Sequence, residues 1–146
     1  MTFIDALLKK SNNLTAASKF QSLTGVIYLA MGAGLVVWPQ QVQVLLRDPP
    51  FTGHEAALFR VIGMSVMGLG LHYYFGGRTG GEQMVAASLI ERLIFVPLVC
   101  LPLAFAGAFP HALIFVTVLD MSLAVYSWIL LRATPSHESL GQIGRA

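Results

Sequence analysis

Three charged residues lie inside apolar stretches of this 146-residue sequence, where they could do chemistry. Glu91 and Arg92 interrupt the apolar stretch from 84 to 106, and Asp120 lies near the middle of the stretch from 110 to 131. A charged side chain at the centre of a membrane helix costs about 2.5 to 3.5 kcal/mol on insertion scales, so such residues usually face a protein partner, a cavity or a proton path. These three residues are therefore the first candidates for a functional site.

The depth of these charges predicts how they pair. Arg92 lies about eight residues and Asp120 about eleven residues from the same end of the spans, so their backbones differ in height by roughly 5 Å. We predict an Arg92–Asp120 ion pair between the third and fourth spans, because pairing removes two isolated charges from the membrane. Glu91 points about 100° away from Arg92 around the helix and is expected to face another span, towards His72 or Tyr28.

Two further residues could complete a site from the second stretch, 56–75. Arg60 lies about one turn inside its boundary, where it either extends outward as an anchor or joins a buried ion pair. His72 precedes two tyrosines at the opposite boundary, where aromatic residues are common. We hypothesise that Glu91, Arg92 and Asp120 line a pocket with Arg60 or His72 at its ends. The alternative is a polar clamp that only holds the helices together.

Other motifs carry no chemistry. His54 and Glu55 are adjacent and do not share a helix face, so they do not predict a metal site. The glycine-rich turn 76–81 lacks the preceding strand and the following Gly-Lys-Ser/Thr of a phosphate-binding loop. Cys100, the single cysteine, lies inside the third stretch and is interpreted as a packing residue. We expect no metal and no cofactor.

The composition is typical of an integral membrane protein. Hydrophobic residues make up 55% of the chain and charged residues 11%, whereas charged residues make up about a quarter of a soluble domain. Each span needs roughly 20 apolar residues, and the sequence predicts an all-α bundle of four transmembrane helices over residues 21–132, with spans near 23–38, 56–75, 84–106 and 110–131. No run of basic residues is present, which excludes nucleic acid as a partner.

The segments outside the spans have their own patterns. Residues 1–20 predict an amphipathic helix on the membrane surface rather than a signal peptide, because Asp5 interrupts the apolar positions and two lysines follow them. The connection 39–55 is apolar enough to lie flat on the membrane, and Asp48-Pro49-Pro50 forces an extended segment or turn. Residues 133–146 predict a polar, disordered tail.

Small residues and prolines indicate how the spans pack. Glycines of the first two spans predict close contact between helices, since small residues let membrane helices approach. Pro97 and Pro102 each remove a helical hydrogen bond and should bend the third span. The freed carbonyl groups must find partners or water, so the bend is a candidate place for a cavity. The glycines are Gly25, Gly32 and Gly34 in the first span and Gly63, Gly68 and Gly70 in the second.

Basic residues predict the orientation. Four spans place both termini on one side, and that side carries six basic residues, whereas only Arg47 lies outside the spans on the other. The six are Lys9, Lys10, Lys19, Arg78, Arg132 and Arg145. The positive-inside rule then places both termini in the cytoplasm.

Three segments carry a resemblance to a known group. They are residues 58–63 (LFRVIG), 91–97 (ERLIFVP) and 118–120 (VLD). In a four-span chain with an apolar first loop, they resemble small bacterial inner-membrane proteins of the DoxX-like group over nearly all of residues 20–132. The resemblance implies a four-helix bundle in the inner membrane and no particular activity or substrate. A more distant analogy is with EXPERA-type four-span sterol isomerases and lipid-binding proteins, although the acidic positions match no motif that can be aligned.

Three functions remain open. The sequence favours a non-catalytic membrane module that binds an apolar or lipid-like ligand, or that serves as an accessory subunit of a larger membrane protein. The second hypothesis is an enzyme that modifies a lipid or isoprenoid, in which Glu91 and Asp120 move protons and Arg92 stabilises charge. The third is a transporter or proton path, which would need a homo-oligomer because four short helices scarcely enclose a pore. Membrane lipids are expected partners in all three.

Overall fold

The computed structural model describes residues 11–12 and 14–133, and this part of the chain is helical without strands. The expected surface helix over 1–20 and the polar tail therefore fall largely outside the described residues. The helices are α2 (Ala16–Val37), α3 (Pro39–Leu46), α4 (Glu55–Arg78), α5 (Glu82–Ile90), the π-helix η1 (Glu91–Phe95), α6 (Val96–Phe105) and α7 (Pro110–Ala133).

Four helices are long and apolar enough to cross a membrane: Ala16–Val37, Glu55–Arg78, Glu82–Phe105 and Pro110–Ala133. The third of these joins α5, η1 and α6 into one span. The all-helical, four-span prediction is confirmed to this extent. The first helix starts before residue 23, because Thr15 accepts a hydrogen bond from the backbone N–H of Ser18 at 3.2 Å and caps it there.

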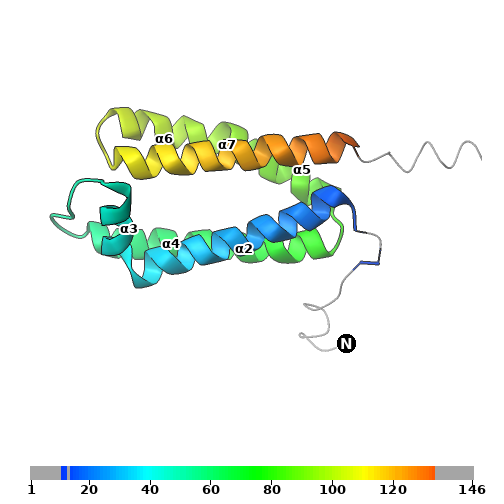
Figure 1. Ribbon diagram of the computed structural model, residues 1–146, viewed down its shortest axis with the longest axis horizontal. Helices are drawn as coiled ribbons and strands as arrows, with labels where there is room; N and C mark the ends of the chain where they lie inside the picture. Colours follow the sequence, from blue (N-terminus) through cyan, green and yellow to red (C-terminus); the bar gives the residue numbers. More distant parts are fainter. Residues whose placement is uncertain (1–10, 13, 134–146) are drawn as a thin grey trace, which may run out of the picture.

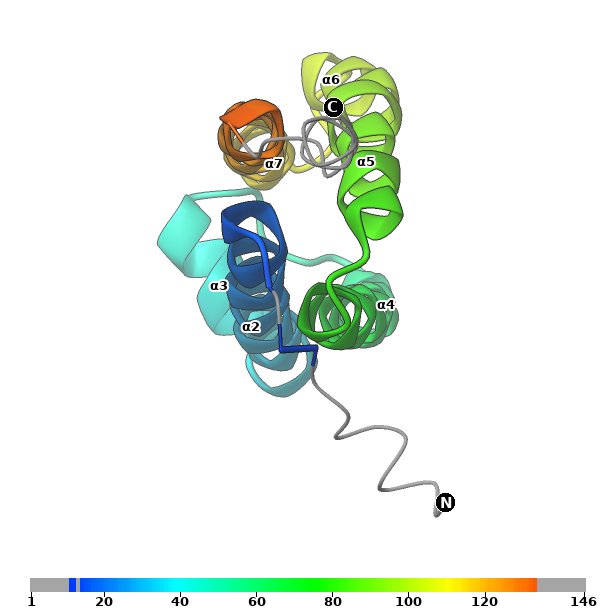
Figure 2. The same ribbon diagram turned by 90° about the vertical axis from the view of Figure 1, so that its right-hand side faces the viewer.

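The spans form two layers (Figures 1 and 2). One layer holds α2 and α4, and the other holds α6 and α7, with α5 leading from the end of α4 towards the second layer. We call the end where α4 stops the Arg78 end, since α2 begins, α5 begins and α7 finishes there as well (Figure 1). We call the opposite end, where α3 and the start of α7 lie, the Asp48 end.

Glycines bring α2 and α4 into backbone contact. A Cβ atom added to Gly25 would lie 2.6 Å from the carbonyl oxygen of Gly70, and one added to Gly32 would lie 2.5 Å from that of Gly63. No side chain fits at such distances, so the expected close contact is confirmed at these four glycines. Gly34 and Gly68 meet nothing within 4 Å and take no part in it.

The third span widens at the predicted bend. Pro97 has no N–H to donate to the carbonyl of Leu93, and its ring crowds that carbonyl. The backbone N–H of Val96 donates instead to the carbonyl of Glu91, five residues back, which makes the π-helix η1. Such π segments are frequent at functional sites, and this one carries both Glu91 and Arg92.

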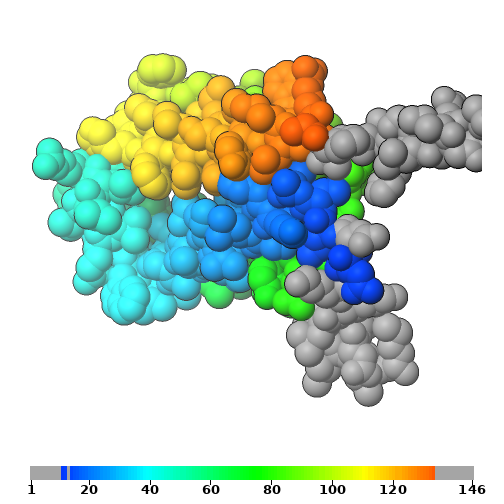
Figure 3. Space-filling view, turned by 45° about the vertical axis from the view of Figure 1, so that its right-hand side comes forward, coloured from blue at the N-terminus to red at the C-terminus, as the bar shows by residue number. Residues whose placement is uncertain are grey.

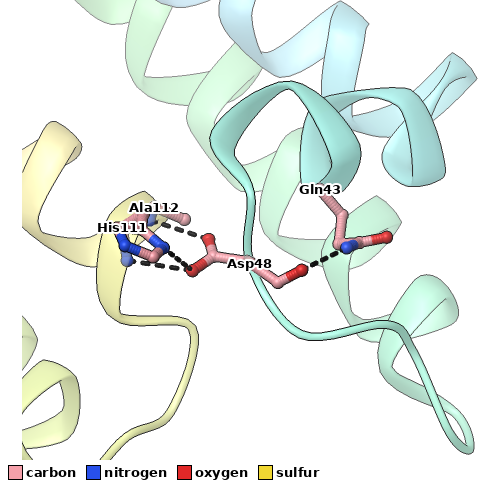
Figure 4. A network of polar contacts seen from close by, with 4 residues as sticks. All are labelled: Gln43, Asp48, His111 and Ala112. Atoms are coloured by element: carbon pink, nitrogen blue, oxygen red, sulfur yellow. Dashed lines mark hydrogen bonds and ion pairs between the residues drawn. The ribbon is translucent and has the colours of Figure 1, made fainter.

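Asp48 fastens the first long connection to α7 (Figure 4). Its buried carboxylate accepts hydrogen bonds from the backbone N–H groups of His111 at 2.9 Å and Ala112 at 2.8 Å. Gln43 of α3 donates to the backbone carbonyl of Asp48. The sequence predicted a turn at Asp48-Pro49-Pro50 but not that the aspartate would satisfy the first N–H groups of a helix 63 residues away.

The distribution of polarity matches a protein that meets lipid. Large apolar side chains are exposed along all four spans, including Val61, Ile94, Leu98 and Ile129. The described interior, by contrast, is polar, because more than half of its buried side chains carry polar or charged groups. These residues are Ser18, Gln21, Thr24, Asp48, Ser88, Arg92, Thr117, Asp120 and Ser127. In Figure 3, α7 runs along one side of the molecule, beside α2 near the Arg78 end and beside the region of α3 near the Asp48 end.

Candidate functional site

Arg92 of η1 lies in the centre of the bundle. Its side chain is fully buried, with 0% exposure. The guanidinium carbon lies 4.4 Å from the ring centroid of Tyr73 on α4 and 5.2 Å from that of Tyr28 on α2. The two rings themselves pack edge to face. The faces of tyrosine rings attract cations, and the attraction grows when water is absent. The two rings therefore hold the guanidinium in place.

The hydroxyl groups of these tyrosines hold the two acidic side chains. Tyr28 donates a hydrogen bond to Asp120 of α7, and Tyr73 donates one to Glu91 of η1. We call Tyr28, Tyr73, Glu91, Arg92 and Asp120 the charged cluster. It draws on all four spans, because its members come from α2, α4, η1 and α7.

The predicted ion pair between Arg92 and Asp120 is not formed. In the described part of the chain no carboxylate oxygen lies within 4.0 Å of a nitrogen of Arg92. Tyr28 contacts both charged groups instead: its ring lies against the guanidinium of Arg92, and its hydroxyl donates to Oδ1 of Asp120. The two charges meet through a tyrosine instead of directly.

All three nitrogens of Arg92 are buried without a hydrogen-bond partner: Nε, Nη1 and Nη2. A guanidinium carries five N–H donors and cannot be neutralised in a protein. More than nine in ten buried polar groups in proteins are hydrogen-bonded, so an unpaired arginine calls for an explanation. Ring contacts replace part of its hydration, but they supply no acceptor in the plane of the N–H groups.

Glu91 faces another span, as predicted; that span is α4, and its partner there is Tyr73. The prediction named His72, the residue directly before Tyr73 on α4, or Tyr28 on α2. Glu91 is half-buried, whereas Arg92 is fully buried. The two adjacent side chains thus reach the same tyrosine ring from different sides, one at its hydroxyl and one at its face.

Arg60 and His72 lie apart from the charged cluster. Both side chains are exposed on α4. The Nε of Arg60 donates to the backbone carbonyl of Val36 at 3.2 Å, and the Nδ1 of His72 lies 2.8 Å from the carbonyl oxygen of Gly68. The structure therefore brings together three of the five predicted site residues, and places Arg60 as an anchor near the Asp48 end.

A groove of about 440 Å³ runs along the outer face of α7. It carries no charged residue, and its serine, Ser122, donates to the carbonyl of Val118 in its own helix. This groove contributes mainly apolar contacts, of the kind that a lipid chain also makes, and the hydroxyl of Tyr126 is its other polar group. The residues that line it are Met121, Ser122, Val125, Tyr126 and Ile129.

The two tyrosines were missed as site residues. Tyr28 was named only as one possible neighbour of Glu91, and Tyr73 was read as part of an aromatic belt. Their signal in the sequence was weak, since tyrosine is common at membrane boundaries. Comparisons with models of known protein families, with curated proteins and with solved structures found no match to this chain, so the DoxX-like resemblance stays a prediction.

Proposed function

We propose that this chain is a small membrane protein that binds an apolar, lipid-like molecule, whose polar head is held by Arg92 inside the bundle. One observation carries the proposal: the guanidinium is fully buried and its three nitrogens have no hydrogen-bond partner. A buried charge without acceptors is among the most costly arrangements in a protein interior. A ligand that brings an acceptor to it removes that cost.

The chemistry of the site points to an oxygen-bearing head. Guanidinium N–H groups bind planar oxygen acceptors best, such as a carboxylate, a phosphate or a carbonyl group. Glu91 and Asp120 each accept a hydrogen bond from a tyrosine hydroxyl. They act there as acceptors, so the donors for the ligand's oxygen would come from Arg92. The apolar remainder of the ligand would lie between or against the spans, where large apolar side chains are exposed.

The same contacts favour binding over catalysis. An enzyme would need a carboxylate within hydrogen-bond reach of the proton that it moves. Both carboxylates of the charged cluster instead accept hydrogen bonds from tyrosines in the described structure. The lipid-modifying enzyme remains the alternative. Native mass spectrometry would reveal it if the mass of the bound ligand changed on incubation.

The proposal includes an orientation in the bacterial inner membrane. Lys19, Arg78 and Arg132 lie at or near the Arg78 end, and Arg47 lies near the Asp48 end. Basic residues next to membrane spans remain in the cytoplasm. We accordingly assign the Arg78 end to the cytoplasmic side. Cysteine labelling at Thr79 and at Thr52, one at each end, tests this assignment independently of any ligand.

Native mass spectrometry of the protein, extracted gently from its own membrane, tests the binding proposal. We expect a stoichiometric small molecule on the wild-type protein that is lost from Arg92→Met. Methionine keeps an apolar chain of similar length and removes the donors. Arg60→Met is the matched control, because it removes an arginine that lies on the outer surface of α4.

Three outcomes decide between the functions. Ligand retained by Arg60→Met and lost from Arg92→Met supports the proposal, provided that both variants elute as folded protein. Equal retention by both variants contradicts it. A larger protein assembly without any small molecule would make the chain an accessory subunit, in which the charged cluster serves assembly.

A further inference from the structure

A second polar layer lies inside the bundle, between the charged cluster and the Arg78 end. Gln21 of α2, Ser88 of α5 and Ser127 of α7 are each at most 2% exposed. The hydroxyl of Ser88 lies 3.3 Å from Oε1 of Gln21, which ties α5 to α2. Ring contact between Phe20 and Tyr126, at 4.6 Å, places α7 against the same turn of α2. The three side chains thus come from neighbouring turns of three helices.

This layer belongs to a continuous polar seam. On α2 the buried positions 18, 21, 24 and 28 follow helical spacing, and on α7 so do 117, 120, 124 and 127. On the third span, Ser88 lies one turn before Arg92. Ala124 apart, these positions carry polar side chains. The seam therefore runs from near the Arg78 end to Tyr28, Arg92 and Asp120.

Two atoms of the layer have no partner. The side-chain nitrogen of Gln21 and the hydroxyl of Ser127 are buried without a hydrogen bond. In a membrane protein, polar side chains between helices normally pair with one another or with backbone. Thr24, in the same seam, does so by donating to the carbonyl of Phe20 at 3.0 Å. A dry seam would leave the side-chain nitrogen of Gln21 and the hydroxyl of Ser127 unpaired, which is costly inside a protein.

We propose that Gln21, Ser88 and Ser127 form a water-binding site that hydrates the seam from the Arg78 end. A buried water typically makes about three hydrogen bonds to groups that otherwise lack partners. The amide nitrogen of Gln21 supplies donors and the hydroxyl of Ser127 both donates and accepts, whereas the hydroxyl of Ser88, whose proton already goes to Val85 and Gln21, accepts. The layer lies about six residues inside the helix ends, or roughly 9 Å, which is within reach of bulk water at that end.

The proposal concerns the route of water and does not rest on the ligand of Arg92. Its consequence is that the charged cluster exchanges water and protons with one side of the membrane only. Towards the Asp48 end, Gly32 is the one buried residue of α2 beyond Tyr28, and Thr117 of α7, one turn beyond Asp120, donates its hydroxyl proton to the carbonyl of Leu113 in its own helix. On that side of the cluster, the described residues of α2 and α7 thus include no buried polar side chain without a partner.

Silver ions test the proposal, because they react with thiols in water and do not enter dry, apolar surroundings. The variants are made in Cys100→Ala protein reconstituted in lipid vesicles. Ser127→Cys is compared with Val125→Cys and Ile129→Cys, which lie two residues deeper and two residues shallower on α7 and are exposed to lipid. Silver binding is followed as a mass increase over time.

We expect Ser127→Cys to react at least about tenfold faster than both lipid-facing variants, because an ion in apolar surroundings without water is strongly disfavoured. Ser88→Cys should also react faster than the lipid-facing variants, and it replaces Ser127→Cys in the comparison if Ser127→Cys does not fold. Gln21→Leu should slow the reaction of Ser127→Cys by about tenfold, because it removes a water partner. Rates for Ser127→Cys and Ser88→Cys no higher than for the lipid-facing variants, or no effect of Gln21→Leu, would overturn the proposal.

Discussion

The hydroxyl of Tyr28 donates a hydrogen bond to the carboxylate of Asp120, a residue 92 positions later in the chain. This contact joins the first described span to the last. Tyr28 also contacts Arg92, because its ring lies against the guanidinium, and Arg92 itself makes no ion pair in the described structure. The centre of the bundle is therefore built from tyrosine–carboxylate pairs around a cation.

The first prediction is that Tyr28 and Asp120 are energetically coupled. Tyr28→Phe leaves a buried carboxylate without its donor and should lower the free energy of unfolding by about 1 to 3 kcal/mol. In a double-mutant cycle with Asp120→Asn, we expect an interaction energy of about 0.5 to 3 kcal/mol. Unfolding of the purified protein in mixed detergent micelles, with increasing dodecyl sulfate, measures each corner of the cycle.

Tyr74→Phe provides the control cycle. Its hydroxyl accepts a hydrogen bond from Arg78 at 2.8 Å, at the end of α4 and apart from Asp120. Its interaction energy with Asp120→Asn should fall below about 0.5 kcal/mol, as for independent sites. An equal interaction energy in both cycles would mean that the Tyr28–Asp120 contact has no special role.

The second prediction concerns the contact between α2 and α4. Gly25→Ala places a methyl group 2.4 Å from the backbone nitrogen of Tyr74, so the helices must separate. We expect a loss of about 1 to 3 kcal/mol in the free energy of unfolding, as for other overpacked interiors. The same unfolding titration measures it.

Gly34→Ala is the matched control in the same helix. A Cβ atom there meets nothing within 4 Å, and alanine favours the helix over glycine by roughly 0.5 to 1 kcal/mol. We expect this variant to be as stable as the wild type or slightly more stable. Equal destabilisation by the two substitutions would show that the loss at Gly25 does not come from its close contact with α4.

The sequence was sufficient for the spans and for the α2–α4 contact, because both depend on local patterns. Apolar length marks a span, and glycines spaced by seven residues mark a face that can approach another helix. It also placed Glu91, Arg92 and Asp120 in the interior. Their partners were not predictable in the same way, since Tyr28 and Asp120 meet only after two separate spans have packed.

The position of Glu91 relative to Arg92 shows where local geometry suffices and where it stops. A separation of about 100° on one helix predicted that the two side chains face different neighbours. Glu91 does reach another span, α4, but it meets the hydroxyl of the same Tyr73 whose ring lies against Arg92. The choice of Tyr73 over His72 depends on the rotation of α4, which its glycine contacts with α2 fix. No pattern within either segment encodes that rotation.

The third prediction is that Asp48 stabilises the fold through the start of α7. Asp48→Ala leaves the backbone N–H groups of His111 and Ala112 without acceptors. Loss of a capping side chain typically lowers stability by about 0.5 to 2 kcal/mol, and a negative charge near a helix N-terminus adds to the effect. We expect a decrease of this size, together with faster hydrogen exchange at the amides of residues 111 and 112.

Two further variants separate the capping by the carboxylate from its contact with the His111 ring, whose Nδ1 lies 3.3 Å from Oδ1 of Asp48. The His111 side chain is 61% exposed, so His111→Ala removes only a solvent-screened pair and should change stability by at most about 1 kcal/mol. Both backbone hydrogen bonds survive in that variant, and the exchange of both amides should stay slow.

Asp48→Asn has one carbonyl oxygen where the carboxylate has two. It can keep one of the two hydrogen bonds, while its NH₂ group opposes the other N–H. Its stability should lie between those of Asp48→Ala and the wild type. If His111→Ala proved as harmful as Asp48→Ala, the ion pair and not the capping of α7 would be the source of the stability.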